Sequence, residues 1–143
     1  MDLLNPALEK REVLGKNALA LAHVGDGVYE LMVRTMLASS AVYSNAKQHR
    51  LTLGYVSAEA QAAAAAKLMP LLSEEEREFY QRGRNAHTGT VPKHAGPAVY
   101  HAATGLETLF GALWLLGRRE RLEELFEVIC KEEKETNEGK EDE

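Results

Sequence analysis

Two carboxylates stand almost alone on apolar stretches of this sequence. Glu107 is the only Asp, Glu, Lys or Arg between Lys93 and Arg118. Asp26 lies between two glycines in NALALAHVGDGVYELMV, where Glu30 is the only other such residue. An ionised carboxylate is costly to bury without a partner, so both side chains raise a question of function. If they converge with room for water, they form a site of hard oxygen ligands, which suits Mg²⁺.

Each acidic residue also has a simpler interpretation. Glu30 lies four residues before Arg34, so an ion pair along one helix satisfies it. Asp26 can accept a hydrogen bond from a nearby backbone group or from His23, one turn earlier. Glu107 can form a buried pair with an arginine of another helix. Sequence spacing does not show convergence, but both carboxylates have neighbouring glycines, which cost about 1 kcal/mol each inside a helix and mark close approach.

A locally basic segment precedes Glu107. Residues 79–106 contain no acidic residue but include RGRNAHTGTVPKHAG, which is rich in Gly, Pro and Thr and is expected to be mostly loop. Cationic and amide side chains with exposed backbone amides are typical phosphate contacts, although a solvated surface loop has the same composition. The candidate residues for such phosphate contacts are Arg82, Arg84, Asn85 and Lys93. The sequence has no Cys/His cluster with ligand spacing, no G-x-S-x-G and no Walker-type loop, so zinc, serine and cysteine chemistry have little support.

The elements that position these residues are predicted to be helices, because alternating strand patterns are absent and helix formers dominate. Asp26 falls in a long amphipathic helix over residues 17–38, and Glu107 in one that starts near Pro97 and ends near Gly117. Ser44 and Ser57 can cap two further helices, and Ser73 with Glu76 fits a capping box. The remaining predicted helices cover residues 45–53, 57–69, 73–83 and 118–131. The fold class predicted is therefore all-α.

Composition indicates one soluble domain, residues 1–130, followed by an acidic, disordered tail, residues 131–143. The chain has 143 residues, 45% of them hydrophobic and 27% charged, with a net charge of −5. The tail KEEKETNEGKEDE holds seven acidic and three basic residues, so it accounts for most of that charge. Cys130 is the single cysteine and cannot form an internal disulfide. No bilayer-spanning run or signal peptide is apparent, and the expected location is cytoplasmic.

The motifs in their order resemble the ribonuclease III family, and within it the small mini-ribonuclease III group. Residues 19–26 read LALAHVGD, and residues 56–62 read VSAEAQA. Residues 82–93 read RGRNAHTGTVPK, and residues 105–115 read GLETLFGALWL. The resemblance covers residues 16–129. The RGRNA-x-x-GT-x-PK motif is its most specific part, since the Gly-Asp segment alone is weak.

The resemblance implies an endoribonuclease that cleaves double-stranded RNA with Mg²⁺, or Mn²⁺ as an alternative, and leaves 5′-phosphate ends. It implies a homodimer with one site per subunit, no separate double-stranded-RNA-binding domain, and maturation of the precursor of large-subunit (23S) ribosomal RNA. By position, Asp26 and Glu107 match the catalytic, metal-holding carboxylates. Larger members carry further acidic residues one turn earlier, where this chain has Ala22 and Thr104. The resemblance therefore does not carry a full two-metal site onto this chain.

Two other classes of function remain open from the sequence. One is a non-catalytic module of the same fold that binds double-stranded RNA or assists ribosome assembly; loss of the carboxylates would be its usual sign, and both are present. The other is an unrelated helical structural protein with two satisfied buried acids, which would have no affinity for RNA.

Overall fold

The fold is helical throughout the part of the chain that the structure describes. The computed structural model describes the backbone of residues 1–86 and 96–141 and the side chains of residues 1–86 and 96–131. No strand occurs among these residues, so the all-α prediction is confirmed. The helices are α1 (Lys10–Leu14), α2 (Ala18–Ser40), α3 (Asn45–Val56), α4 (Ala58–Leu68), the 3₁₀ turn η1 (Met69–Leu71), α5 (Glu74–Arg84), α6 (Pro97–Leu115) and α7 (Arg119–Glu141).

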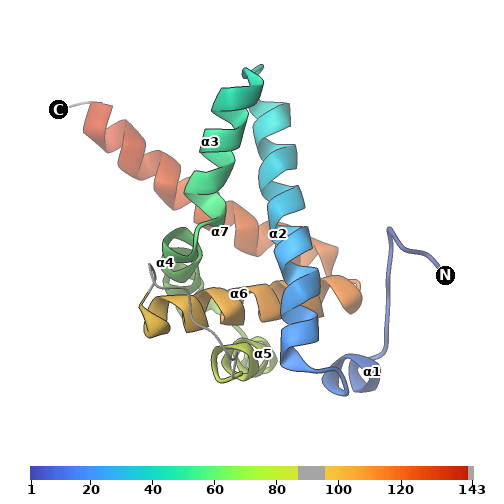
Figure 1. Ribbon diagram of the computed structural model, residues 1–143. Helices are drawn as coiled ribbons and strands as arrows, with labels where there is room; N and C mark the ends of the chain where they lie inside the picture. The colour runs from blue at the N-terminus through green and yellow to red at the C-terminus, as the bar shows by residue number, and fades with distance from the viewer. Residues whose placement is uncertain (87–95, 142–143) are drawn as a thin grey trace.

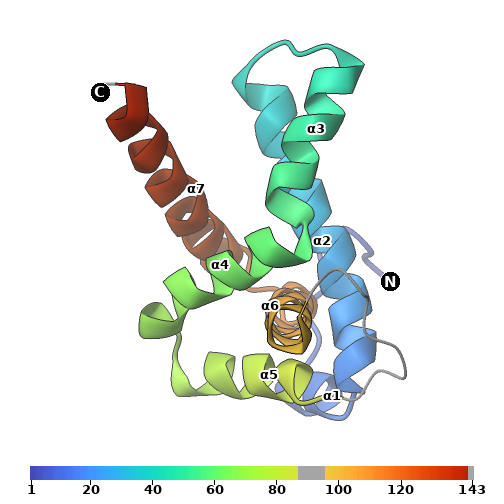
Figure 2. The same ribbon diagram turned by 60° about the vertical axis from the view of Figure 1, so that its left-hand side comes forward.

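Helix α6 lies at the centre of the molecule and packs against α2, α4, α5 and α7 (Figures 1 and 2). The N-terminal half of α2 crosses α6. The C-terminal half of α2 continues beyond the other helices. There it pairs with α3, and the two helices form a hairpin that projects away from α5 and α6 in both views. The α2–α3 hairpin carries a polar pocket of its own.

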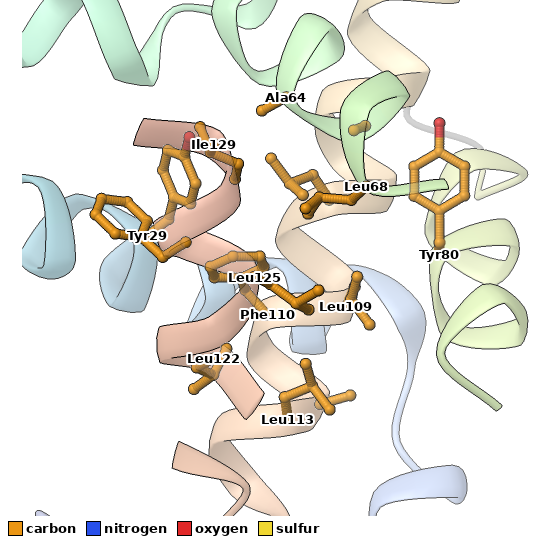
Figure 3. Packing of buried hydrophobic residues seen from close by; sticks show 14 of the residues in the cluster. Tyr29, Ala64, Leu68, Tyr80, Leu109, Phe110, Leu113, Leu122, Leu125 and Ile129 are labelled. Atoms are coloured by element: carbon orange, nitrogen blue, oxygen red, sulfur yellow. The ribbon is translucent and has the colours of Figure 1, made fainter. Parts of the chain in front are cut away.

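The hydrophobic core forms around the apolar face of α6. Leu109, Phe110 and Leu113 are fully buried, and they belong to one hydrophobic cluster with residues of α7, including Leu125 (Figure 3). The ring of Tyr29 packs edge-on against Phe110, with 5.2 Å between ring centroids. Full burial of a Leu or Phe side chain contributes about 1.5–3 kcal/mol relative to exposure, so these contacts hold α2 and α7 against α6.

Helix starts follow the capping residues expected from the sequence. The Ser44 and Ser57 hydroxyls accept from the backbone N–H of Lys47 and Ala60, at 3.1 and 3.2 Å. Ser73 and Glu76 form the reciprocal capping box, with distances of 2.8 and 3.2 Å. These interactions satisfy backbone donors that have no partner within the helix, which explains why the predicted starts agree with the structure.

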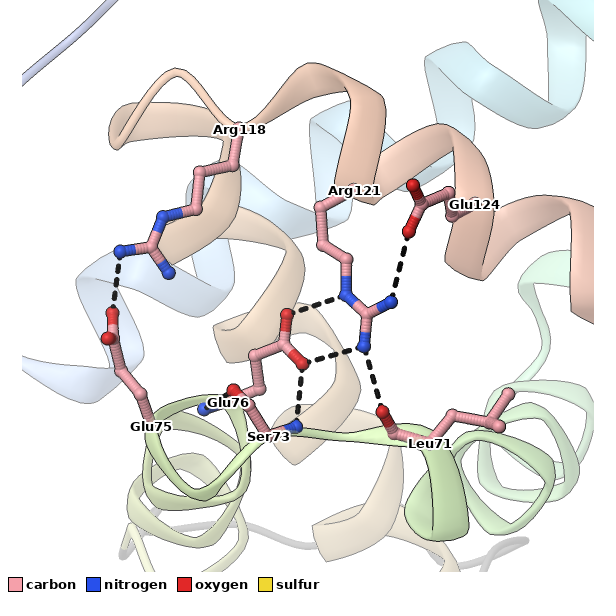
Figure 4. Close-up of polar contacts among 7 residues, drawn as sticks. All are labelled: Leu71, Ser73, Glu75, Glu76, Arg118, Arg121 and Glu124. Atoms are coloured by element: carbon pink, nitrogen blue, oxygen red, sulfur yellow. Dashed lines mark hydrogen bonds and ion pairs between the residues drawn. The ribbon is translucent and has the colours of Figure 1, made fainter.

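A buried carboxylate fastens α5 to α7. Arg121 of α7 donates from Nε and Nη2 to the two carboxylate oxygens of Glu76, at 2.8 and 2.9 Å, and from Nη2 to the Leu71 carbonyl (Figure 4). Burial by itself raises the pKa of Glu76, but the hydrogen bonds from Arg121 and Ser73 outweigh it and hold that pKa below its usual value. Glu76 is thus a buried acid with a purely structural partner, unlike the two carboxylates of the site.

Two elements depart from the sequence prediction. The short helix α1 was not expected. The last helix was expected to end near Lys131, where the apolar periodicity stops, but α7 runs to Glu141. Glu and Lys are good helix formers, so the backbone continues as a helix without an apolar face to pack. The division into a domain of residues 1–130 and a tail of residues 131–143 stays a prediction.

Candidate active site

The crossing of α2 and α6 depends on two glycines that let the backbones touch. A Cβ atom on Gly25 would lie 1.6 Å from the carbonyl oxygen of Glu107, and one on Gly111 would lie 1.9 Å from that of Leu21. No side chain fits at either position. Because Asp26 follows Gly25 directly, this contact brings Asp26 of α2 beside Glu107 of α6, which the sequence could not show.

The environments of the two carboxylates differ. Asp26 is exposed at the surface of α2, whereas Glu107 is partly buried. Burial, together with the nearby negative charge of Asp26, raises the pKa of Glu107 to about 8. A carboxylate whose ionisation is disfavoured by burial and by a neighbouring carboxylate, as at Glu107, forms a site that favours a cation.

Within the described residues, the ion-pair and histidine partners considered for the two carboxylates are not found. Within residues 1–86 and 96–131, no hydrogen bond or ion pair joins Asp26 to His23 or Glu107 to an arginine. Glu30 does have the expected ion pair, with Arg34 Nη2 at 3.1 Å from its carboxylate. Glu30 therefore has an ion-pair partner on the helix surface. Within the described residues, no such pair is found for Asp26 or Glu107.

Among the described residues, Asp26 and Glu107 are the acids that the site offers as metal ligands. No group of three or more His, Cys, Asp or Glu that could hold a metal ion occurs in the described part of the chain. One turn before each carboxylate lie the buried residues Ala22 and Thr104, and the Thr104 hydroxyl donates to the Tyr100 carbonyl at 3.0 Å. Mg²⁺ commonly takes one or two carboxylates and completes its shell with water and phosphate oxygens, so this pair fits one such ion.

The four predicted RNA-binding residues fall in different environments. Arg82 points inward: its Nη2 donates to the Lys16 carbonyl at 2.7 Å, and its Nη1 is buried. This contact ties α5 to the residues just before α2. Lys93 lies outside the described residues. Arg84 and Asn85 are exposed at the C-terminal end of α5.

Arg84 and Asn85 share a small polar pocket with the start of α6. The pocket has a volume of about 220 Å³ and is also lined by Pro97, Ala98 and His101. The His101 ring Nδ1 lies 3.0 Å from the Arg84 carbonyl oxygen, which requires a hydrogen on that nitrogen. The other ring nitrogen of His101, Nε2, then remains available to a ligand. Sequence reasoning did not select His101 as a site residue; its place in the acid-free segment was the only signal.

An apolar groove lies between α2 and the residues at the end of α6 and the start of α7. It has a volume of about 350 Å³ and includes Gly27, Leu31 and Trp114. Leu31 is 62% exposed, unusually high for a large apolar residue in the middle of a helix. The two glycines that flank Asp26 therefore have different surroundings: Gly25 contacts α6, and Gly27 lines this groove.

None of the helices among the described residues is both long and apolar enough to cross a bilayer.

Comparisons with known proteins point to one family. The sequence profile of the Ribonuclease III domain matches residues 19–118. A Mini-ribonuclease 3 from Enterococcus faecalis is 44% identical over 124 residues, which cover 85% of this chain and 94% of that protein. A Mini-ribonuclease 3 from Symbiobacterium thermophilum is 46% identical over 112 residues, covering 78% and 86%. The crystal structure of a Fusobacterium nucleatum protein superposes with a TM-score of 0.77 at 26% identity, covering 85% of this chain and 98% of that one.

Proposed function

The chain belongs to the ribonuclease III family and is an endoribonuclease, and we propose that it hydrolyses double-stranded RNA with Mg²⁺ at Asp26 and Glu107. One observation carries this proposal. The glycine-mediated crossing of α2 and α6 brings together two carboxylates that have no basic partner within the described residues. A satisfied structural acid would resemble Glu76, which is held by Arg121.

Asp26 and Glu107 would hold the cation with their carboxylate oxygens. When bound, Mg²⁺ polarises a phosphate oxygen and lowers the pKa of a bound water, which promotes attack on phosphorus. Glu107 must lose its proton to serve as a ligand, because burial and the charge of Asp26 keep it protonated up to about pH 8. Mn²⁺ has similar ligand preferences and is a second candidate cation.

Recognition of the duplex is assigned to Arg84, Asn85 and Lys93. Arg84 and Asn85 are exposed and adjacent, so they can contact backbone phosphates and 2′-hydroxyls. The deep major groove of A-form RNA hides the base edges, so such contacts read shape more than sequence. Arg82 is reassigned within this proposal, because its guanidinium already binds the Lys16 carbonyl.

We propose further that two copies of the chain act together on one duplex. The apolar groove beside Gly27 and the exposed Leu31 offer a surface that a second copy would cover. Each subunit would contribute one pair of carboxylates. The natural substrate proposed is precursor large-subunit ribosomal RNA in the cytoplasm, on the strength of the mini-ribonuclease III motifs.

Incubation of the purified protein with a double-stranded RNA, with Mg²⁺ and then with EDTA, tests the function. Cleavage that requires the cation and leaves 5′-phosphate ends is expected. Binding without cleavage in Mg²⁺ would point instead to the non-catalytic RNA-binding module. Absence of both would indicate a helical structural protein.

A further inference from the structure

A second polar pocket lies on the α2–α3 hairpin, apart from the one beside Arg84. It has a volume of about 170 Å³ and is lined by Arg34, Asn45, Gln48, His49 and Thr52. Each lining side chain carries a hydrogen-bonding group, and none is acidic. Thr52 Oγ1 donates to the backbone carbonyl of Gln48 at 2.8 Å. The pocket is thus built from neutral and cationic donors.

The charge around this pocket favours an anion. Residues 31–58, which form most of the hairpin, contain no Asp or Glu but include Arg34, Lys47 and Arg50. α3 has no acidic residue in its first turn, and the amides at a helix N-terminus carry partial positive charge. Asn45 and Gln48 lie in that turn, so this partial charge acts directly on the pocket.

One acidic side chain, Glu30, adjoins the pocket through Arg34. The two form an ion pair at 3.1 Å, with side chains 39% and 59% exposed. Exposed pairs of this kind contribute about 0–1 kcal/mol, so the contact does not commit Arg34 to Glu30. A guanidinium has five N–H donors, and those not used by Glu30 remain available to a second anion.

The pocket is aligned with the candidate active site. Asp26, Glu30 and Arg34 follow one another at intervals of four residues, so they lie along the same side of α2. At 1.5 Å per residue, Arg34 is about 12 Å along the helix axis from Asp26. α2 runs without interruption from the crossing with α6 to the hairpin (Figure 1). A strand that passes Asp26 can therefore continue beside the pocket.

We propose that the α2–α3 pocket binds a backbone phosphate of the same RNA duplex that is cut at Asp26 and Glu107. This inference rests on the proposed function. Pockets for whole small molecules are typically about 300–1,000 Å³, so a pocket of about 170 Å³ suits a single group of the strand, and its cationic and amide lining favours a phosphate. Arg34, Gln48 and His49 are then positioning residues that fix the strand relative to the carboxylates without reading its sequence.

Binding measurements on the full chain with Glu107→Gln, which prevents cleavage, test this proposal. Affinity for a labelled double-stranded RNA is measured at several salt concentrations. Arg34→Gln should weaken binding several-fold and reduce the slope of log affinity against log salt by about one unit. His49→Ala should also weaken binding. Glu30→Gln should strengthen it, because the carboxylate that competes for Arg34 is removed.

The matched control is Arg11→Gln. Arg11 is a basic residue of α1, which lies at the opposite end of α2 from the hairpin (Figure 1). Affinity and salt slope should stay unchanged in this variant. A second duplex of unrelated sequence should show the same loss with Arg34→Gln, since a phosphate contact is independent of sequence.

The failures of the two proposals are distinguishable. If Arg34→Gln and His49→Ala behave like the Arg11 control while the wild type still cuts with Mg²⁺, the pocket assignment is overturned and the proposed function stands. A loss confined to one sequence also overturns it. If the Glu107→Gln protein does not bind duplex RNA and the wild type does not cut it, both proposals fail.

Discussion

Glu107 is the residue whose surroundings say most about the chemistry of this protein. Its partial burial and the adjacent Asp26 disfavour the ionised form, and the attraction to a bound cation would offset both effects. Asp26→Asn or Glu107→Gln should therefore abolish cleavage while RNA binding and the helical fold persist. Cleavage assays beside circular dichroism check this, and a near wild-type rate for either variant would refute the assignment.

The raised pKa of Glu107 also predicts how stability depends on pH. In the absence of a divalent cation, the folded protein holds a proton at Glu107 up to about pH 8, whereas the unfolded chain releases it near pH 4.5. This contribution to stability is complete below pH 4.5 and is lost as the pH rises to about 8.

Urea denaturation in EDTA across that window measures the effect. As the pH rises through this window, the ionisation of Glu107 should lower the free energy of unfolding by up to about 1.4 kcal/mol per pH unit. Glu107→Gln should remove this part of the pH dependence. An identical pH profile for the variant and the wild type would contradict the assigned cause.

Arg82 and Arg84 are two residues apart but should respond differently to substitution. Arg84→Ala should weaken RNA binding and make the salt slope shallower by about one unit, with stability nearly unchanged. Arg82→Ala should lower the free energy of unfolding, because its hydrogen bond to the Lys16 carbonyl is lost. Salt-dependent binding and urea denaturation of both variants test this contrast, which fails if their effects are alike.

At the scale of helices, the close crossing of α2 and α6 is the critical feature. Gly25→Ala introduces a Cβ that would lie 1.6 Å from backbone, so the helices must separate. Overpacking usually costs about 1–3 kcal/mol, and here it would also move Asp26 away from Glu107. We expect lower stability and a larger loss of cleavage rate than the stability change alone explains.

Gly54→Ala provides the matched control for that substitution. Gly54 lies within α3 and has no atom within 4 Å of an added Cβ. Alanine there should stabilise the helix by up to about 1 kcal/mol. Urea denaturation and cleavage assays of both variants decide the matter, and equal behaviour would mean that the crossing tolerates a side chain.

At the scale of the whole molecule, the exposed apolar groove predicts association. Leu31→Glu should disrupt a dimer that covers the groove, with a lower mass in light scattering and reduced cleavage. Leu71→Glu is the control, because Leu71 is also exposed, at 49%, but lies outside the groove. An active wild-type monomer at assay concentration would rule out the dimer as the working unit.

Local features of the sequence determined most of the helices and the identity of the two carboxylates. Serine caps, the Ser73–Glu76 capping box and Pro97 in the first turn of α6 act over a few residues, so the sequence alone predicts them. The isolation of Asp26 and Glu107 among apolar residues is likewise visible without a structure. The all-α class follows from the same short-range patterns.

Only the tertiary structure decided how these parts meet. Asp26 and Glu107 are far apart in sequence, and their approach depends on which helix faces Gly25 and Gly111, a packing choice that no local pattern encodes. The inward turn of Arg82 toward Lys16 was missed for the same reason. Long-range contacts arise from the simultaneous fit of several helices, whereas caps and periodicity arise from neighbours along the chain.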